Sequence, residues 1–208
     1  MSQLALPLAW PANPDDDAFL VAASNERAVR VLEDWASWPV RTGLLVGPRR
    51  SGRSLLARVF ARNSGGVVID GAERRPEAAL FHAWNRAETA NRPLLLVVDE
   101  LPPAWEIRLP DLRSRIAAST VAAIGPPDET LARALLEREL ARRGLDARPD
   151  LVAWIAARIE RSHAALLGAV DALDARAMER RRGLSIPFAR DTLTEAGLLG
   201  SPPSPEEP

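Results

Sequence analysis

The eight residues from Gly47 to Ser54 have the types and the spacing of a phosphate-binding loop. They read Gly-Pro-Arg-Arg-Ser-Gly-Arg-Ser, which fits the pattern G-x-x-x-x-G-K-[ST] except that Arg53 replaces the lysine. In such a loop, backbone N–H groups and the N-terminus of the following helix bind phosphate oxygens, and the Ser54 hydroxyl can bind Mg²⁺. The candidate nucleotide-binding residues are Gly47, Ser51, Gly52, Arg53 and Ser54.

The arginine at position 53 changes the expected chemistry. A guanidinium group keeps the positive charge of lysine but is larger and planar, so the two side chains are not equivalent. We therefore expect ADP or ATP as the cofactor, with Mg²⁺, and weak or no intrinsic ATPase activity. A strand–turn–helix that has kept the shape of the loop and lost the ligand remains an open alternative.

Two acidic segments are candidates for the metal-binding acid, because each follows a short apolar run. Asp99 and Glu100 have the better local pattern, but they lie only about ten residues before the segment 109–111. In a P-loop ATPase of this type another strand and helix should intervene, and Asp70 leaves room for them. We therefore assign Asp70 to the Walker B role, with Ser54 and Asp70 as Mg²⁺ ligands, and place Glu100 in the sensor 1 region at the tip of the next strand.

Apolar runs and helical periodicity predict the elements that position these residues. Continuous apolar runs alternating with helices indicate a parallel sheet covered on both faces. Strands are expected at 44–46, 67–69, 94–98 and 121–124, and helices at about 25–38, 54–63 and 76–90. Ser24 is the expected N-cap of the first helix.

After residue 125 the pattern becomes entirely helical. Helices are expected at about 128–143, from 149, at about 162–182 and from 187. The predicted fold is α/β, with a P-loop core around a reduced parallel sheet of about four to five strands, followed by a small all-helical lid domain. The predicted domains are an extended arm at 1–17, the α/β domain at 18–125, the lid at 126–199 and a disordered tail at 200–208.

Composition limits the classes of function. The net charge is -1 over 208 residues, so there is no overall positive field that would hold the protein on DNA or on an anionic membrane. All 27 basic residues are arginine, there is no cysteine, and the two histidines lie far apart, which argues against a thiolate or histidine metal site. The apolar runs are too short to span a bilayer, so we expect a cytoplasmic protein without membrane contact.

The motifs together resemble a known family. The chain is similar to the ATPase domain of the bacterial replication initiator DnaA, and more closely to the DnaA-related Hda proteins, which tend to carry Gly-Arg-Ser in the phosphate loop. The resemblance rests on residues 19–25, 47–54, 68–73, 109–115, 125–128 and 184–188. It implies the AAA+ fold and the initiator DnaA as a partner.

The resemblance also implies roles for two arginines. Arg115 matches the arginine finger that such proteins present to a nucleotide on a neighbouring molecule, and Arg113 is the nearby alternative. The lid arginine that senses nucleotide in the family falls on Ala164, so Arg161 or Arg158 would have to substitute for it. The stretch between Gly47 and Asp70 is short, so one strand–helix unit of the family's core is missing.

The N-terminal arm carries the most specific pattern. Its sequence Gln-Leu-Ala-Leu-Pro-Leu at 3–8 resembles the Gln-Leu-x-Leu-Pro-Leu peptide by which Hda proteins bind the DNA polymerase sliding clamp. Leucines of a short extended peptide fill an apolar pocket, and proline limits the cost of ordering. The candidate clamp-binding residues are Gln3, Leu4, Leu6, Pro7 and Leu8. An arm folded back on its own domain is the alternative.

The sequence therefore predicts a clamp-tethered, nucleotide-responsive regulator that promotes hydrolysis of initiator-bound ATP and so represses replication initiation. Contact with DNA is expected only indirectly, through the clamp, because no DNA-binding domain of the initiator type follows the lid. Two other functions stay open: an independent P-loop NTPase or chaperone of DNA enzymes, and a clamp adaptor with a vestigial nucleotide site. A homo-oligomer is also left open.

Overall fold

The computed structural model describes residues 19–180 and 183–199. These residues form two compact units, one up to Gly125 and one from Pro126 onward. The predicted clamp-binding arm and the predicted C-terminal tail lie outside the described residues, so their proposed structures are untested.

A four-stranded parallel sheet forms the centre of the first unit. Its strands are β1 (Thr42–Val46), β2 (Val67–Asp70), β3 (Leu94–Val98) and β4 (Thr120–Ala123). Their spatial order is β2-β3-β1-β4, with β1 pairing in parallel with both β3 and β4. The carboxyl ends of β2, β3 and β1 therefore meet at one edge, which brings together the segments that carry the predicted loop and the two acidic candidates.

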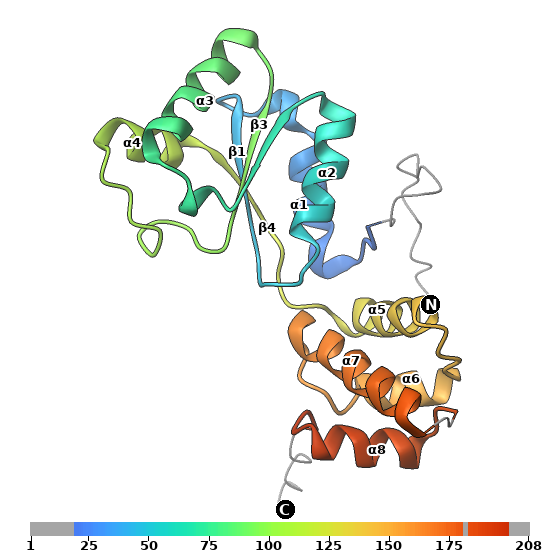
Figure 1. The fold of residues 1–208 in the computed structure, drawn as a ribbon. Helices are drawn as coiled ribbons and strands as arrows, with labels where there is room; N and C mark the ends of the chain where they lie inside the picture. Colours follow the sequence, from blue (N-terminus) through green and yellow to red (C-terminus); the bar gives the residue numbers. More distant parts are fainter. Residues whose placement is uncertain (1–18, 181–182, 200–208) are drawn as a thin grey trace, which may run out of the picture. The chain divides into compact units, whose positions relative to one another are not determined.

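Helices cover both faces of this sheet (Figure 1). Helices α1 (Ala23–Glu33) and α2 (Arg53–Ser64) pack on one face, and α3 (Glu77–Ala90) and α4 (Pro110–Ala118) pack on the other. Along β3, Leu95 and Val97 point to the first face and the alternate residues to the second, as the two-residue period of a strand requires. Every residue of β3 is buried, which explains its continuous apolar run.

The first helix differs from the prediction at its start. It begins at Ala23, so Ser24 lies within the first turn and does not cap the helix. Asn25 satisfies the backbone there: its Oδ1 accepts the N–H of Ala22 at 2.8 Å, and its Nδ2 donates to the carbonyl of Leu20 at 2.8 Å. The Ser24 prediction was wrong because Asn25 can bond to the backbone on both sides of the helix start.

The first helix also ends earlier than residue 38. A short 3₁₀ turn (Trp35–Ser37) follows it, and Trp38 then turns into the core, where its indole stacks on Phe60 with ring centroids 5.7 Å apart. A Cβ on Gly43 would lie 2.4 Å from the Trp38 ring. This close approach explains why the second residue of β1 is a glycine.

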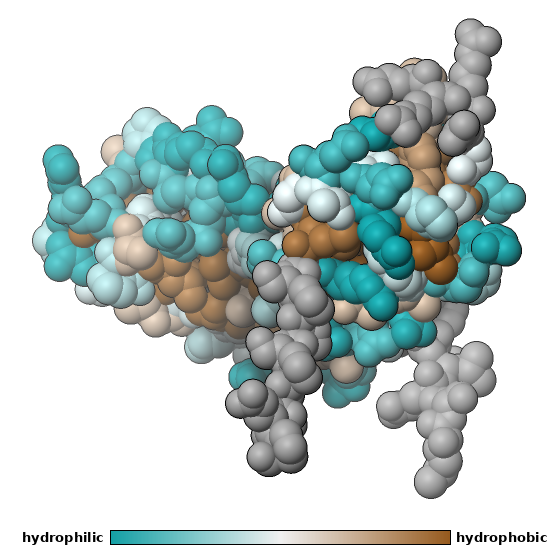
Figure 2. Space-filling model, turned by 90° about the horizontal axis from the view of Figure 1, so that it is seen from below, coloured by the Kyte–Doolittle hydropathy of each residue, from teal (hydrophilic) through white to brown (hydrophobic). Residues whose placement is uncertain are grey.

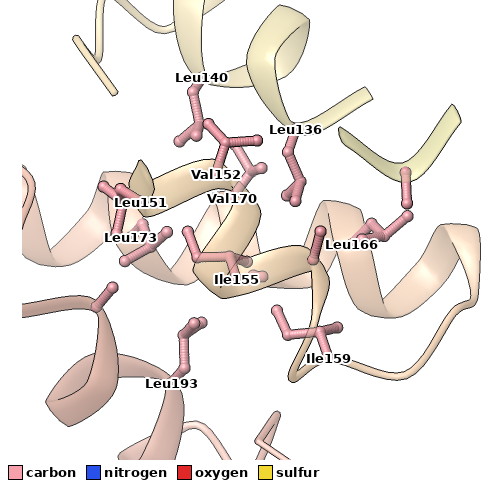
Figure 3. Packing of buried hydrophobic residues seen from close by; sticks show 14 of the residues in the cluster. Leu136, Leu140, Leu151, Val152, Ile155, Ile159, Leu166, Val170, Leu173 and Leu193 are labelled. Atoms are coloured by element: carbon pink, nitrogen blue, oxygen red, sulfur yellow. The ribbon is translucent and has the colours of Figure 1, made fainter. Parts of the chain in front are cut away.

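The second unit is a bundle of four helices within the described residues. They are α5 (Glu129–Arg142), α6 (Pro149–Ala156), α7 (His163–Arg180) and α8 (Ile186–Glu195). All four contribute to one apolar core (Figure 3), whose leucines, isoleucines and valines are at most 5% exposed. Side chains of Asp128 and Ser185 cap α5 and α8 by accepting backbone N–H groups. The predicted starts of these helices agree with the structure to within one residue.

The described helices were compared with what a membrane crossing needs, and one face of the molecule is shown by hydropathy in Figure 2. None of the described helices has both the length and the hydropathy that a membrane crossing needs. In the space-filling view, hydrophilic residues cover most of the visible face, and hydrophobic patches are bordered by hydrophilic residues (Figure 2).

Candidate nucleotide site

The phosphate loop connects β1 to α2 and depends on two glycines. Gly52 is the N-cap of α2 and has a φ of +85°, in the left-handed region that glycine adopts without strain. A Cβ on Gly47 would lie 3.0 Å from the backbone oxygen and the Cβ of Ile124, at the end of β4. The loop therefore passes close to the neighbouring strand and then turns so that the N-terminus of α2 is available for an anion.

Ser51 lies inside this loop with an unused polar atom. Its side chain is buried, and its hydroxyl has no hydrogen-bond partner among the described residues. A buried hydroxyl without a partner is unfavourable, and a bound phosphate or water would satisfy it. This observation fits a loop that holds a polar ligand.

Ser54 and Asp70 lie together, as expected for two ligands of one metal ion. The Ser54 hydroxyl donates to Oδ2 of Asp70 at 2.6 Å, across the gap between the start of α2 and the end of β2. Both residues are exposed. Hydroxyl and carboxylate oxygens suit Mg²⁺, which typically takes one or two protein ligands together with phosphate oxygens and waters. The described residues contain no cluster of three acidic or histidine side chains, so this pair fits a phosphate-bound Mg²⁺ and not a free-standing metal centre.

Arg53 is held by the end of β3. Its Nη1 donates to the backbone oxygen of Val98, and its Nη2 lies 2.5 Å from Oδ1 of Asp99. The Arg53 side chain is only 11% exposed. Asp99 directly follows β3, the strand beside β2, and the sequence analysis did not anticipate its contact with the loop arginine. Sheet order is the missing signal, because β3 is the direct neighbour of β1.

A second arginine also contacts Asp99. Nη1 of Arg74, from the 3₁₀ turn after β2 (Ala72–Arg74), lies 3.3 Å from Oδ2 of Asp99 and 3.2 Å from the carboxylate of Glu73. The hydrogen bond from Arg53 is the main reason that the pKa of Asp99 lies below its usual value; partial burial opposes the shift, and the charges of both arginines add to it. Asp99 therefore stays ionised between two cations.

These residues surround a cavity of about 380 Å³. Four arginines line it together with Asp70 and Asp99, so cationic side chains outnumber anionic ones by two. The arginines are Arg49, Arg50, Arg53 and Arg74. Glu100 is exposed and does not line the cavity, so Asp99 is the acid of this pair that borders the site. An open cavity of this charge suits a phosphate-bearing ligand.

Arg115 lies elsewhere in the same unit, on α4. Its Nη1 donates to Oδ1 of Asn85 at 2.5 Å, and its Nη2 lies 3.1 Å from Oδ2 of Asp111. Its guanidinium group also lies 4.4 Å from the ring centre of Phe81 and 4.2 Å from that of Trp84. The alternative finger, Arg113, donates from Nε to the backbone oxygen of Ile107.

Glu77 fixes the start of the helix that carries both arginines. Its carboxylate accepts the N–H groups of Arg108 and Leu109 at 2.9 and 2.7 Å, just before α4 begins at Pro110. These two hydrogen bonds are the main cause of the lowered pKa of Glu77. Arg115 does not line the cavity of its own chain, and its role as a finger stays a prediction.

In the lid unit, Ala164 lies in the first turn of α7 and is exposed. Of the two substitutes named for the sensing arginine, Arg161 lies 3.8 Å from Glu129, and Arg158 lies over the ring of Trp154 at 4.8 Å. Both arginines therefore have partners within the lid, and their role toward nucleotide remains a prediction. His163 is buried beside Ala164, and burial lowers its pKa, so the imidazole is neutral near pH 7.

Comparison with known proteins found a family match for the lid unit and structural matches that cover both units. Residues 128–193 match the family described as the Hda lid domain. Over 89% of this chain and 98% of the other, the structure superimposes on domain III of the replication initiation protein DnaA from Thermotoga maritima, with a TM-score of 0.71 and 16% identity. The lid unit therefore matches the Hda lid domain family, and the chain shares the fold of DnaA domain III. Its α/β core and helical lid are those of the AAA+ fold, as the sequence predicted.

Other similar structures carry the same fold. AMPPCP-bound DnaA from Aquifex aeolicus gives a TM-score of 0.63 at 12% identity, over 89% of this chain and 70% of the other. The Holliday junction branch migration motor RuvB from Thermotoga maritima gives 0.59 at 12% identity, over 82% and 67%. At these identities the likeness concerns the fold alone.

A curated relative shares sequence over a shorter stretch. It is an uncharacterized protein of Haemophilus influenzae, 28% identical over 118 residues, which are 56% of this chain. The match spans about half the length (51%) of that relative.

Proposed function

We propose that this Hda-like protein regulates replication initiation by acting on DnaA, and that it promotes hydrolysis of the ATP that DnaA holds. The observation that carries the proposal is the match of residues 128–193 to the Hda lid domain, joined to an α/β core with the fold of DnaA domain III. Two chains of one fold can pack against each other as neighbours in an AAA+ assembly, with an arginine of one chain at the nucleotide of the other.

The nucleotide site of the protein itself serves regulation and not turnover in this proposal. Three features support binding of ADP or ATP with Mg²⁺: the phosphate loop, the Ser51 hydroxyl that lacks a partner among the described residues, and the Ser54–Asp70 pair. Arg53 is engaged by Asp99, which is unfavourable for the role of the loop lysine in stabilising transferred phosphate. We expect turnover below about 1 s⁻¹ for the isolated protein, under the range of typical enzymes.

The clamp is the second proposed partner. Burial of two leucine side chains from the arm would contribute roughly 3–6 kcal/mol before ordering costs, so one arm should bind with about micromolar affinity. The arm lies outside the described residues, and its support is the sequence of residues 3–8. Tethering at the clamp would raise the local concentration of the protein near newly replicated DNA.

A reconstituted assay tests the proposal directly. ATP-loaded DnaA is incubated with DNA-loaded clamp, with and without the protein, and released phosphate is measured. The matched pair is the triple change Gln3→Ala, Leu6→Ala and Leu8→Ala against the single change Asn13→Ala in the same arm. Stimulation that is lost in the triple variant and kept in the control, with an unchanged thermal midpoint, supports the proposal.

The outcomes also separate the other functions. No stimulation by the wild-type chain at saturating clamp would overturn the regulatory function. Clamp capture without stimulation would favour the adaptor with a vestigial site, and fast ATP turnover without DnaA would favour an independent NTPase. Clamp binding that persists in the triple variant, together with a loss of several degrees in thermal midpoint, would identify the arm as a structural strap.

A further inference from the structure

The loop arginine is satisfied by its own protein. Arg53 donates to the backbone oxygen of Val98 and to the carboxylate of Asp99, and nine-tenths of its side chain is shielded from solvent. A phosphate that binds to the loop must therefore compete with groups that Arg53 already contacts. A neutral ligand would not face this competition.

We propose that Asp99 is an internal counter-ion that holds Arg53 away from the loop, is displaced by nucleotide phosphates, and so sets the affinity of the site. This inference rests on the proposed function in one respect, since it takes the 47–54 loop as the phosphate site. It adds a residue and a regulation that the loop motif does not contain. We call the contact of Arg53 with Asp99 and Val98 the Asp99 latch.

Asp99 also reduces the positive field of the cavity. It holds Arg74 as well as Arg53, and these are two of the four arginines that line the cavity. Neutralising Asp99 would leave Asp70 as the acid among the lining residues, and Asp70 faces Ser54 at the predicted metal position. A single charge change at residue 99 therefore acts on two cations at once.

The latch is weak enough for phosphate to open it. The Asp99 side chain is 33% exposed, and ion pairs with that much solvent contact contribute about 1 kcal/mol or less. A diphosphate carries more negative charge than one carboxylate and also receives the backbone N–H groups at the start of α2. Binding and unlatching are thus expected to occur together, with Arg53 exchanging one anionic partner for another.

A purely structural reading of the same contacts predicts the opposite effect. If the Arg53–Asp99 pair is a strut that shapes the loop, removing the charge of Asp99 will loosen the loop and weaken phosphate binding. The two readings therefore differ in the sign of one measured change, which makes the inference testable with a single conservative substitution.

The experiment measures binding of Mg²⁺–ADP, pyrophosphate and adenosine to the full chain by isothermal titration calorimetry. Asp99→Asn keeps the size and an acceptor oxygen while removing the charge. Affinity for ADP and pyrophosphate should rise by up to about fivefold, which is the effect of an ion pair worth about 1 kcal/mol or less. Affinity for adenosine should not change, because adenosine carries no phosphate.

Two controls isolate the latch. Glu100→Gln makes the same change in net charge one residue away, outside the cavity lining, and should have less than about a twofold effect. In an Arg53→Met background, Asp99→Asn should give a smaller gain, because Arg53 is absent and only the contact of Asp99 with Arg74 is removed. If Asp99→Asn does not fold, Arg53→Lys replaces it: an ammonium group cannot bond in the forked way of Arg53, so phosphate affinity should again rise.

Each result decides one question. A wild-type chain that binds ADP, together with an Asp99→Asn variant that binds it equally or less well, overturns the latch and leaves the proposed function standing. Equal gains with Glu100→Gln also overturn the latch. No binding of ADP or pyrophosphate by any variant overturns both the latch and the nucleotide part of the proposed function.

Discussion

Two arginines of this protein are held in different ways, although the family resemblance gives both a functional role. Arg53 is held at the sheet edge by an acid and a backbone oxygen, with little solvent contact. Arg115 is held on the face of α3 and α4, between the rings of Phe81 and Trp84, with an amide and an acid at its nitrogens. The first arrangement depends mainly on charge, and the second mainly on ring faces and packing.

The two sets of contacts differ in how readily an approaching anion can displace the arginine. An arginine held by a carboxylate can be transferred to a phosphate, because the second anion competes for the same donors. An arginine stacked on rings keeps its position when an anion approaches, because the rings contact the face of the guanidinium group. The partners at its edge, Asn85 and Asp111, can then be exchanged for a phosphate without moving the arginine. Arg53 therefore suits a displaceable contact, and Arg115 suits a pre-positioned group that acts on another molecule.

The largest expected effect is the loss of phosphate binding in Gly52→Asp. A carboxylate at the N-cap of α2 would face the phosphates and repel them, and Gly52 also has a φ of +85°. We expect no detectable Mg²⁺–ADP binding by calorimetry at millimolar ligand.

Gly65→Asp is the matched control for that prediction. Gly65 lies at the other end of α2, has a φ of +65°, and has no atom within 4 Å of the position of a Cβ. It imposes the same kind of backbone strain without touching the loop, so ADP binding should survive. Equal binding by wild type and Gly52→Asp would show that the phosphate site lies elsewhere.

The next effect is that of Arg115→Ala, which should remove stimulation of DnaA-bound ATP hydrolysis in the reconstituted assay. The variant should remain folded, with a loss of about 1–2 kcal/mol in the free energy of unfolding from the two ring contacts. Arg113→Ala is the comparison, because Arg113 is bonded to the loop before α4 and not to the rings. Normal stimulation by Arg115→Ala, with loss in Arg113→Ala, would transfer the finger role to Arg113.

A smaller effect is that the contacts of Arg53 and those of Arg115 should contribute to stability with a different dependence on pH. The folded-state pKa of Asp99 is lowered, so its contribution to stability is present above the ordinary value of 3.8 and is lost as the pH falls through the folded-state pKa. The difference in free energy of unfolding between wild type and Asp99→Asn should be about 1 kcal/mol or less at pH 7 and should be smaller at pH 3, below the ordinary pKa of 3.8. Urea titrations at both pH values measure it.

The ring contacts of Arg115 provide the reference for that measurement. Phe81 and Trp84 do not titrate, so Trp84→Leu should lower the free energy of unfolding by a similar amount at the two pH values. Glu100→Gln is the control for pH effects on the protein as a whole. A pH-independent cost for Asp99→Asn would contradict a charge-based latch.

The smallest expected effect is that of Asn85→Ala. It removes the acceptor of one Arg115 nitrogen and should cost about 0.5–1.5 kcal/mol in the free energy of unfolding. If Asn85 positions Arg115, stimulation of DnaA should fall by a smaller factor than in Arg115→Ala, with ADP binding by the protein unchanged. Wild-type stimulation by Asn85→Ala would show that the rings alone position the arginine.

Much of the fold followed from local patterns. The apolar runs at β1, β2 and β3 and the starts of the helices after residue 125 are local features, so they could be predicted without knowing what packs against them. The start and the end of α1 could not be predicted as well. Asn25 competes with Ser24 for the backbone at the start, and the end depends on Trp38 packing against Gly43 and Phe60, which are distant in sequence.

Spacing along the chain was enough to predict the loop with its arginine, the parallel α/β core and the helical lid, whereas the choice of Asp70 as the Walker B acid stays a prediction. The tertiary structure alone decided that Asp70 contacts Ser54, that Asp99 binds Arg53, and that Arg115 lies between two rings of α3. These contacts join residues 16 and 46 positions apart in the first two cases. Which strand lies beside β1, and which side chain then reaches the loop, is set by packing of the whole sheet and not by any local pattern.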